Sequence, residues 1–339
     1  MGIIMKLPLG KVPISVLRNI LGYVRSDKTV LEAPGVGIDA AVISLRDNII
    51  VSACDPITGA SKDIGWLSVH VNANDIAVCA AYPRWYVVTL LFPPKTTEDD
   101  IYEVMGGIKK ALEEVDANLV SGHTEITNKV SDVIVIGTMI GAPMIKGKYV
   151  SNRNAKVGDY ILMTKGAGIE GTWILAEAFR SKLEIDRMLM EKIMRLKKKI
   201  SVLPDVEAVV KIGVENIHAM HDATEGGVLG ALYELAEASR VGFEVYQENM
   251  IILDETRKIS EYLSIDPLKL ISSGTLIVVV DKDMCDQVVE NLKKKQIDVS
   301  IIGKITDSKR VLIKENGEKT YIDEPPIDEL WRILEGEYG

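Results

Sequence analysis

Blocks of apolar residues, either alternating with polar ones or recurring at helical spacing, fill the first half of the chain. The predicted elements are strands at 40–45, 48–54, 85–92 and 133–141 and helices at about 63–80 and 97–115. A polar hairpin joins the first two strands, and a basic arm rich in glycine and proline, followed by a short helix, precedes them. The pattern predicts an α/β domain.

A polar, punctuated stretch at 148–159 interrupts this pattern and predicts a domain boundary. Beyond it the predicted elements are strands at 159–164, 275–280 and 299–305 and helices within 171–200, at 226–239 and close to the end of the chain. We therefore expect an arm and helix at 1–34, an N-terminal α/β domain at 35–150 and a C-terminal α/β domain at 151–339.

Composition and charge narrow the class of protein. The chain has 339 residues, 47% of them hydrophobic, and a net charge of -9, which argues against a general nucleic-acid binder. No apolar run is long enough to span a membrane, and the first residues do not resemble a signal peptide, so we expect a soluble cytoplasmic protein. Cys54, Cys79 and Cys285 lack metal-ligand spacing, and each is expected to be a small buried hydrophobe.

The segment MHDATEGGVLGALYELAEAS at 220–239 carries the clearest chemical signal. An acidic cluster enters a two-glycine turn that opens onto an amphipathic helix. Gly226 and Gly227 would let backbone N–H groups approach a phosphate, and Asp222 and Glu225 could anchor a cation. His221, beside that aspartate, is a candidate for contact with substrate.

Further carboxylates interrupt apolar elements elsewhere. Asp39 precedes a strand and Asp55 ends the next one, so a hairpin would bring them to neighbouring rims. Asn72 and Asp75 are three residues apart and share one face of a largely apolar helix. Either that face is a solvent-exposed polar stripe, or these oxygen ligands form a magnesium and phosphate site, which is the reading we favour.

Two other motifs offer candidate ligands. In SGHTEIT at 121–127, Thr124 and Glu125 follow a strand-like run and are expected to reach a polar cavity, with Glu125 as a metal ligand. In GAGIEG at 166–171, Gly166 and Gly168 fit a dinucleotide-binding fingerprint, but no second strand ending in an acid follows. These glycines are therefore expected to form a strand-to-helix turn that lines a nucleotide phosphate.

The motifs together resemble the PurM-like superfamily, which includes aminoimidazole ribonucleotide (AIR) synthetase, thiamine-monophosphate kinase, selenophosphate synthetase and the hydrogenase-maturation protein HypE. Within it, the chain is most similar to HypE and AIR synthase-related proteins. The matching segments run in the family's order from about 35 to 305: GIDAAVI, DPITGASKDIGWLSVHVNANDIAVCAAYPRW, SGHTEIT, GDYILMTKGAGIEGT, MHDATEGGVLGALYELAEAS and IDPLKLISSGTLIVVV.

The resemblance implies a two-domain fold with ATP and Mg²⁺ bound between the domains. Asp39, Asp55, Asp75 and Asp222 match the family's metal ligands, with Asn72 beside them. Lys6, Gly10 and Lys11 belong to an arm that folds over the phosphates, and Lys6 or Lys11 would balance the γ-phosphate charge. The resemblance also implies a homodimer in which the N-terminal sheets of the two copies form a barrel, with WYVVTLLF at 85–92 as the edge strand. The C-terminal domain is expected to be a mixed α/β sandwich.

The expected activity is transfer of the γ-phosphate of ATP to an amide, carbonyl or phosphate oxygen of a small or protein-linked acceptor. Three departures from the family bear on this expectation. His123 replaces an acid, Ile38 replaces another, and no cysteine follows Cys285, which argues against carbamoyl-thiol dehydration on the chain's own tail. The alternatives are a small-molecule kinase resembling thiamine-monophosphate kinase and a nucleotide-binding regulatory or maturation partner with weak turnover.

Overall fold

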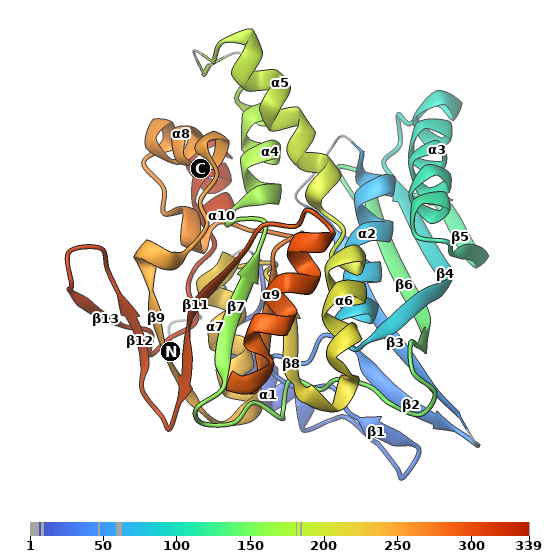
Figure 1. Ribbon diagram of the computed structural model, residues 1–339. Coiled ribbons are helices and arrows are strands. Elements are labelled where there is room, and N and C mark those ends of the chain that lie inside the picture. The colour runs from blue at the N-terminus through green and yellow to red at the C-terminus, as the bar shows by residue number, and fades with distance from the viewer. Residues whose placement is uncertain are drawn as a thin grey trace, which may run out of the picture.

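The computed structural model describes residues 7, 10–46, 48–58, 63–180, 182–183 and 185–338 (Figure 1). For residues 335–338 only the backbone is described. The strands that precede residue 150 in the sequence form one sheet, and those that follow it form another. Helices pack on both, giving the mixed α/β, two-domain PurM-like fold that the sequence predicted. No described helix is both long and apolar enough to cross a membrane.

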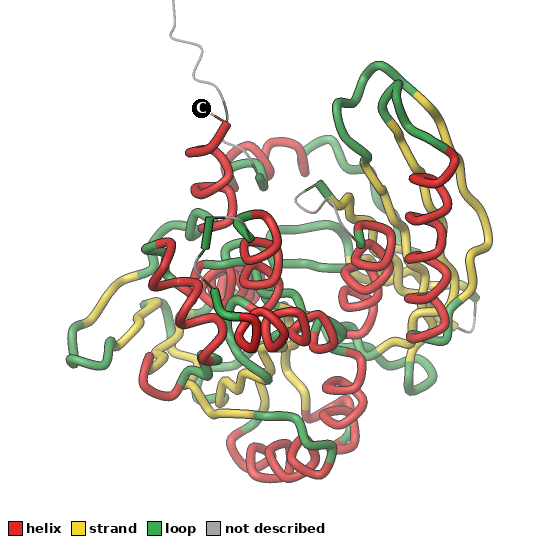
Figure 2. The backbone as a smooth tube through the Cα atoms, turned by 90° about the horizontal axis from the view of Figure 1, so that it is seen from above, coloured by secondary structure: helices red, strands yellow, loops and turns green. Residues whose placement is uncertain are grey.

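The first sheet contains six strands in the order β1-β2-β3-β6-β4-β5. Its strands are β1 (Val30–Glu32), β2 (Ala41–Leu45), β3 (Asn48–Ile57), β4 (Ala81–Phe92), β5 (Asn118–Ile126) and β6 (Ile134–Pro143). Helix α1 (Ile14–Leu21) precedes this sheet in the sequence and pairs with α7 (Gly227–Ser239) of the second half through Arg18 and Glu237. The helices between its strands are α2 (Ile64–Val78) and α3 (Glu98–Glu114). Figure 2 shows α3 running alongside the strands at one side of the molecule.

The prediction that 85–92 forms an edge strand is wrong. These residues belong to β4, which pairs with β6 on one side and with β5 on the other. The reason is that α3 carries the chain back to add β5 parallel to β4, so β5 becomes the edge. Every residue of β5 is exposed, because no described element covers either face of that strand.

The second sheet contains seven strands in the order β13-β12-β9-β11-β7-β10-β8. Its strands are β7 (Tyr160–Thr164), β8 (Ile217–Asp222), β9 (Gly242–Tyr246), β10 (Leu276–Val280), β11 (Val299–Thr306), β12 (Arg310–Ile313) and β13 (Lys319–Tyr321). The helices of this half are α4 (Ile169–Ala178), α5 (Arg187–Leu196), α6 (Leu203–Val209), α7 (Gly227–Ser239), α8 (Asp254–Leu263), α9 (Cys285–Lys294) and α10 (Glu329–Tyr338).

Strand β10 shows how the second domain builds its core. All five of its residues are buried, with Ile277 and Val279 in the cluster that contains α7 and the alternate residues in the cluster that contains α6 and α9. A strand covered on both faces needs a continuous apolar run, which is what LIVVV supplies. Strand β7 pairs antiparallel with both β10 and β11, so GAGIEG does not follow a parallel strand of a dinucleotide-binding fold.

Helix α2 joins the two halves of the molecule. It packs on β3, β4 and β6 and also contacts α6 and β8, and all of its residues are buried. This explains why its sequence is apolar on every side. Where α2 begins, a Cβ on Gly65 would lie 2.2 Å from the Val104 carbonyl oxygen, so glycine allows α2 and α3 to approach closely.

A polar side chain of α2 fastens it to the second half. The Asn74 amide donates to the carbonyl of Ile200 at 2.9 Å and accepts from the backbone N–H of Val202 at 2.9 Å. Both partners lie in the segment between α5 and α6. Because these buried groups satisfy each other, α2 is held in register against the second domain, and its polar residues have fixed positions there.

Candidate functional site

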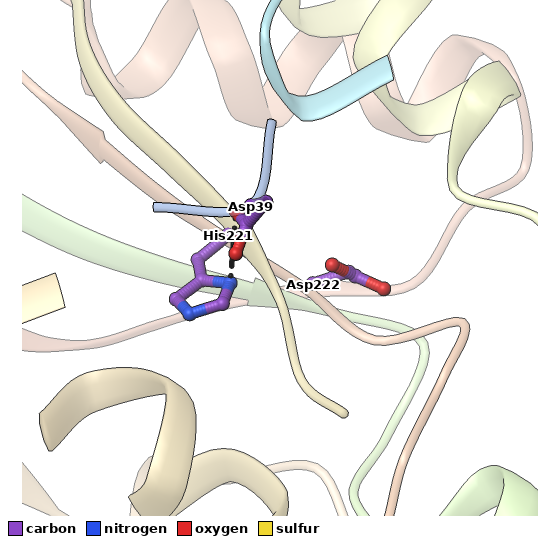
Figure 3. Close-up of side chains that lie close together, drawn as sticks. All are labelled: Asp39, His221 and Asp222. Carbon is purple, nitrogen blue, oxygen red and sulfur yellow. Dashed lines mark ion pairs between the residues drawn. The ribbon is translucent and has the colours of Figure 1, made fainter. Parts of the chain in front are cut away.

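A cluster of ionisable side chains lies where β8 meets the first domain (Figure 3). Asp39, in the loop before β2, places a carboxylate oxygen 3.2 Å from His221 Nδ1. His221 and Asp222 are the last two residues of β8, and a ligand atom from each of the three residues lies within 4.8 Å of the others. In Figure 3, Asp39 and His221 point toward each other and the Asp222 carboxylate points the other way.

Two carboxylates of the first domain face the same cluster. Asp75 on α2 is buried, and Asp55 on β3 is held beside α2 because its backbone N–H donates to Asn72 Oδ1 at 3.0 Å. Burial and the charges of Asp55 and Asp222 raise the pKa of Asp75 well above its ordinary value. Burial and the charge of Asp39 raise the pKa of Asp222 to about 7. The four aspartates therefore converge on one region.

The oxygens of this cluster suit a divalent cation. Both oxygens of Asp222 and Oδ2 of Asp75 are buried and accept no hydrogen bond from the described residues. A buried, unpartnered carboxylate is costly in a folded protein, and an oxygen-binding cation such as Mg²⁺ would relieve that cost. The residues present fit the ion that the sequence predicted, and ion binding itself stays a prediction.

Beside the aspartates, a second network joins the N-terminal arm to α7. Glu234 Oε2 lies 3.1 Å from His221 Nε2, and Glu234 Oε1 lies 3.0 Å from Lys11 Nζ. Burial alone would lower the pKa of His221, but the carboxylates of Asp39 and Glu234 outweigh it and raise the pKa to about 10. Burial opposes ionisation of Glu234, yet Lys11 and His221 lower its pKa to about 2. The positively charged side chains of His221 and Lys11 therefore lie beside the aspartate cluster.

Glu234 and Asn152 belong to the site but were not predicted from the sequence. Glu234 is an acid on a largely apolar helix, seven residues after Gly227, which places it two turns along the same face of α7. That spacing is a signal that sequence reasoning could have used. The Asn152 amide donates to Asp39 Oδ2 at 3.1 Å and to the carbonyl of Gly37 at 3.0 Å, and only the tertiary fold reveals this contact.

The glycine turn departs from its predicted role. The backbone N–H of Gly226 donates to the Asp328 carboxylate at 2.6 Å, and that of Gly227 donates to the Thr224 carbonyl at 3.0 Å. The prediction that these N–H groups are free to bind phosphate is wrong for this structure, because partners within the protein already satisfy them.

The other predicted phosphate and metal ligands lie elsewhere. Gly166 and Gly168 are buried, and a Cβ on either would lie 3.0 Å from Leu253 or Thr256, so both serve packing rather than an open phosphate site. Thr124 and Glu125 are exposed on the edge strand β5, outside the group of His, Cys, Asp and Glu ligands found among the described residues. Lys6 lies outside the described residues.

Comparison with known proteins agrees with this fold. Residues 37–142 match the family described as AIR synthase related protein, N-terminal domain, and residues 156–314 match its C-terminal domain. These two domains, one after the other and each carrying part of the acidic cluster, define the class of protein. The chain belongs to the AIR synthase related family, and within the PurM-like superfamily it lies close to HypE.

Among similar proteins, one from Methanocaldococcus jannaschii named for hydrogenase expression and formation is 28% identical over 311 residues, covering 88% of this chain and 90% of that protein. Carbamoyl dehydratase HypE of Escherichia coli is 25% identical to this chain, and the aligned part covers 82% of this chain and 81% of that protein. A crystal structure of HypE in complex with ATP superposes with a TM-score of 0.68 at 19% identity, covering 93% of this chain and 96% of that one.

Proposed function

We propose that this protein is an ATP- and Mg²⁺-dependent enzyme that transfers the γ-phosphate to an oxygen atom of an amide, carbonyl or phosphate acceptor. The observation that carries the proposal is the convergence of four aspartates, two of which have buried carboxylate oxygens without a hydrogen-bond partner in the described protein. A relative named as an enzyme, carbamoyl dehydratase HypE, and a similar structure that contains ATP support the coarser part of the proposal, an ATP-using enzyme.

In this proposal Asp39, Asp55, Asp75 and Asp222 hold the metal, which when bound would neutralise charge on the triphosphate. Lys11 is linked to His221 through Glu234 and would supply a positive charge to the γ-phosphate. His221, kept protonated by the carboxylates on either side of it, would add a positive charge beside the phosphate and hold Asp39 and Glu234 in place. Phosphoryl transfer needs alignment and charge neutralisation more than covalent chemistry, and these groups supply both.

Calorimetric titration with a non-hydrolysable ATP analogue tests the proposal. Binding is expected in the presence of Mg²⁺ and at least about tenfold weaker after the metal is removed with EDTA, because the aspartates would then repel the triphosphate. ADP release with ATP as substrate, and its stimulation by candidate amide, carbonyl and phosphate acceptors, then measures turnover. Absence of binding under both conditions would contradict the proposal.

We further propose that the protein is a homodimer joined through the first sheet. Half-buried apolar side chains, among them Val87, Ile136 and Ile140, lie on the face of β4 and β6 opposite to α2, and the edge strand β5 exposes Leu119 and Val120. A second copy that covers this face would remove apolar area from water. Light scattering is expected to give twice the 37.3 kDa mass of one chain, and Ile136→Lys is expected to give the single-chain mass.

A further inference from the structure

The N-terminal arm and the C-terminal helix meet at the carboxylate of Glu225, directly before the glycine turn. The backbone N–H of Lys11 donates to Glu225 Oε1 at 2.8 Å, and the indole N–H of Trp331 donates to the same oxygen at 3.0 Å. These residues are 214 and 106 positions away from Glu225 in the sequence. A single acceptor atom therefore links the arm to α10.

The arm fits this junction closely. Gly10 has a φ of +88°, in the left-handed region, and a Cβ at this position would lie 2.1 Å from Glu225 Oε1 and 2.8 Å from the Trp331 indole ring. No residue with a side chain fits without moving one of these groups. The absence of a side chain at residue 10 thus lets the backbone of Lys11 reach Glu225.

The start of α10, which carries Trp331, is held in place by hydrogen bonds. The buried carboxylate of Asp328 accepts hydrogen bonds from the backbone N–H groups of Gly226 at 2.6 Å and Leu330 at 2.7 Å. Leu330 itself is buried in the larger apolar core. These contacts fix the start of α10 against the glycine turn, so the indole N–H points at Glu225 from a defined position.

We propose that Glu225 and Trp331 are positioning residues that hold Lys11 at the nucleotide site; this inference rests on the proposed function. The Lys11 side chain is half exposed, and its ammonium contacts Glu234. Fixing the backbone at Lys11 lowers the conformational entropy that the arm loses when the lysine binds a phosphate. The C-terminal helix thereby contributes to nucleotide affinity without touching the nucleotide.

The first test is Trp331→Phe, which keeps the aromatic ring and removes only the N–H donor. The dissociation constant of the Mg²⁺ complex of a non-hydrolysable ATP analogue is expected to rise roughly 3- to 10-fold, with the melting temperature close to that of the wild type. Turnover, where measured, is expected to show a higher KM for ATP and a nearly unchanged kcat. Glu225→Ala should act in the same direction, whereas Glu225→Gln keeps an acceptor oxygen and should bind nearly as well as the wild type.

A double-mutant cycle with Lys11→Ala distinguishes positioning from a merely structural role. In the Lys11→Ala background, Trp331→Phe is expected to leave nucleotide affinity unchanged, because the group that it positions is gone. The matched control is Trp66→Phe. It removes the hydrogen bond of 2.9 Å that the Trp66 indole N–H donates to Glu114 in the first domain, and it should leave nucleotide affinity unaltered. Equal effects of Trp331→Phe with and without Lys11 would overturn the inference.

A second readout does not depend on nucleotide. Amide hydrogen exchange at Lys11 is expected to be at least about threefold faster in Trp331→Phe, because Glu225 becomes free to turn away from the Lys11 N–H. If the wild type binds no nucleotide, the proposed function fails, and this exchange rate still decides whether Trp331 orders the arm. Unchanged exchange at Lys11 would overturn the positioning role.

Discussion

Asp222→Asn is expected to abolish most nucleotide-dependent activity and at the same time to make the metal-free protein more stable. Neither carboxylate oxygen of Asp222 has a hydrogen-bond partner in the described protein, although the residue is fully buried. Such a group costs folding free energy and is retained where a ligand needs it. Turnover should fall roughly 100-fold or more, as when a group that stabilises the transition-state charge is removed.

The gain in stability follows from the raised pKa of Asp222. With an ordinary value near 3.8 and a folded value of about 7, the protonated carboxyl is favoured in the folded protein. Stability is therefore greatest below the ordinary pKa and is lost as the pH rises through about 7. At pH 8 the neutral amide avoids this loss, so the free energy of unfolding without metal should increase by about 4 kcal/mol, measured by urea denaturation.

Asp205→Asn is the matched control, since Asp205 is also a buried aspartate of the second domain. Its carboxylate accepts from the Thr164 hydroxyl at 2.6 Å and lies 2.9 Å from Lys165 Nζ, so its charge has partners. Removing that charge should destabilise the protein because Lys165 stays buried and loses its counter-charge. A destabilised Asp222→Asn, or one with full activity, would count against Asp222 as a ligand-binding carboxylate.

The parts of this site that sequence reasoning found are those encoded by local pattern. Asn72 and Asp75 lie at helical spacing within an apolar run, and Asp55 lies close to the end of a strand, so their faces follow from periodicity alone. The order of the strands is different in kind. The amino-acid sequence of 85–92 does not determine whether that strand is central or at an edge, because this depends on where the chain places β5 after α3.

The failures at the glycine turn have the same origin. Two glycines before a helix predict free N–H groups, and the local geometry is as expected, with Gly226 in a left-handed conformation before α7. What sequence cannot show is that Asp328, 102 residues away, supplies a carboxylate to that turn. The sequence predicted only a helix close to the end of the chain, whereas Trp331 and Asp328 both contact the segment that follows Asp222.

Glu234→Gln is the second change with a large expected effect, because the Glu234 carboxylate pairs with two positively charged side chains of the proposed site, Lys11 and His221. Without its charge, Lys11 and His221 lose their common anchor, and kcat/KM for ATP should fall roughly 10- to 100-fold, the usual cost of removing a group that orients site residues. Glu237→Gln is the matched control, three residues further along α7. It loses charge pairs to Arg18 and Arg310, both 2.6 Å, and should keep its activity.

The pH dependence of stability gives this prediction a second, independent arm. The folded pKa of Glu234, about 2, lies below its ordinary value of 4.5, so its contribution to stability is fully present above pH 4.5 and is lost as the pH falls through 2. Glu234→Gln should therefore be about 3 kcal/mol less stable than the wild type at pH 7, and the difference should shrink between pH 4.5 and 2. A constant difference across that range would mean that Glu234 acts through packing, and the ionic link from Lys11 to His221 would have to be abandoned.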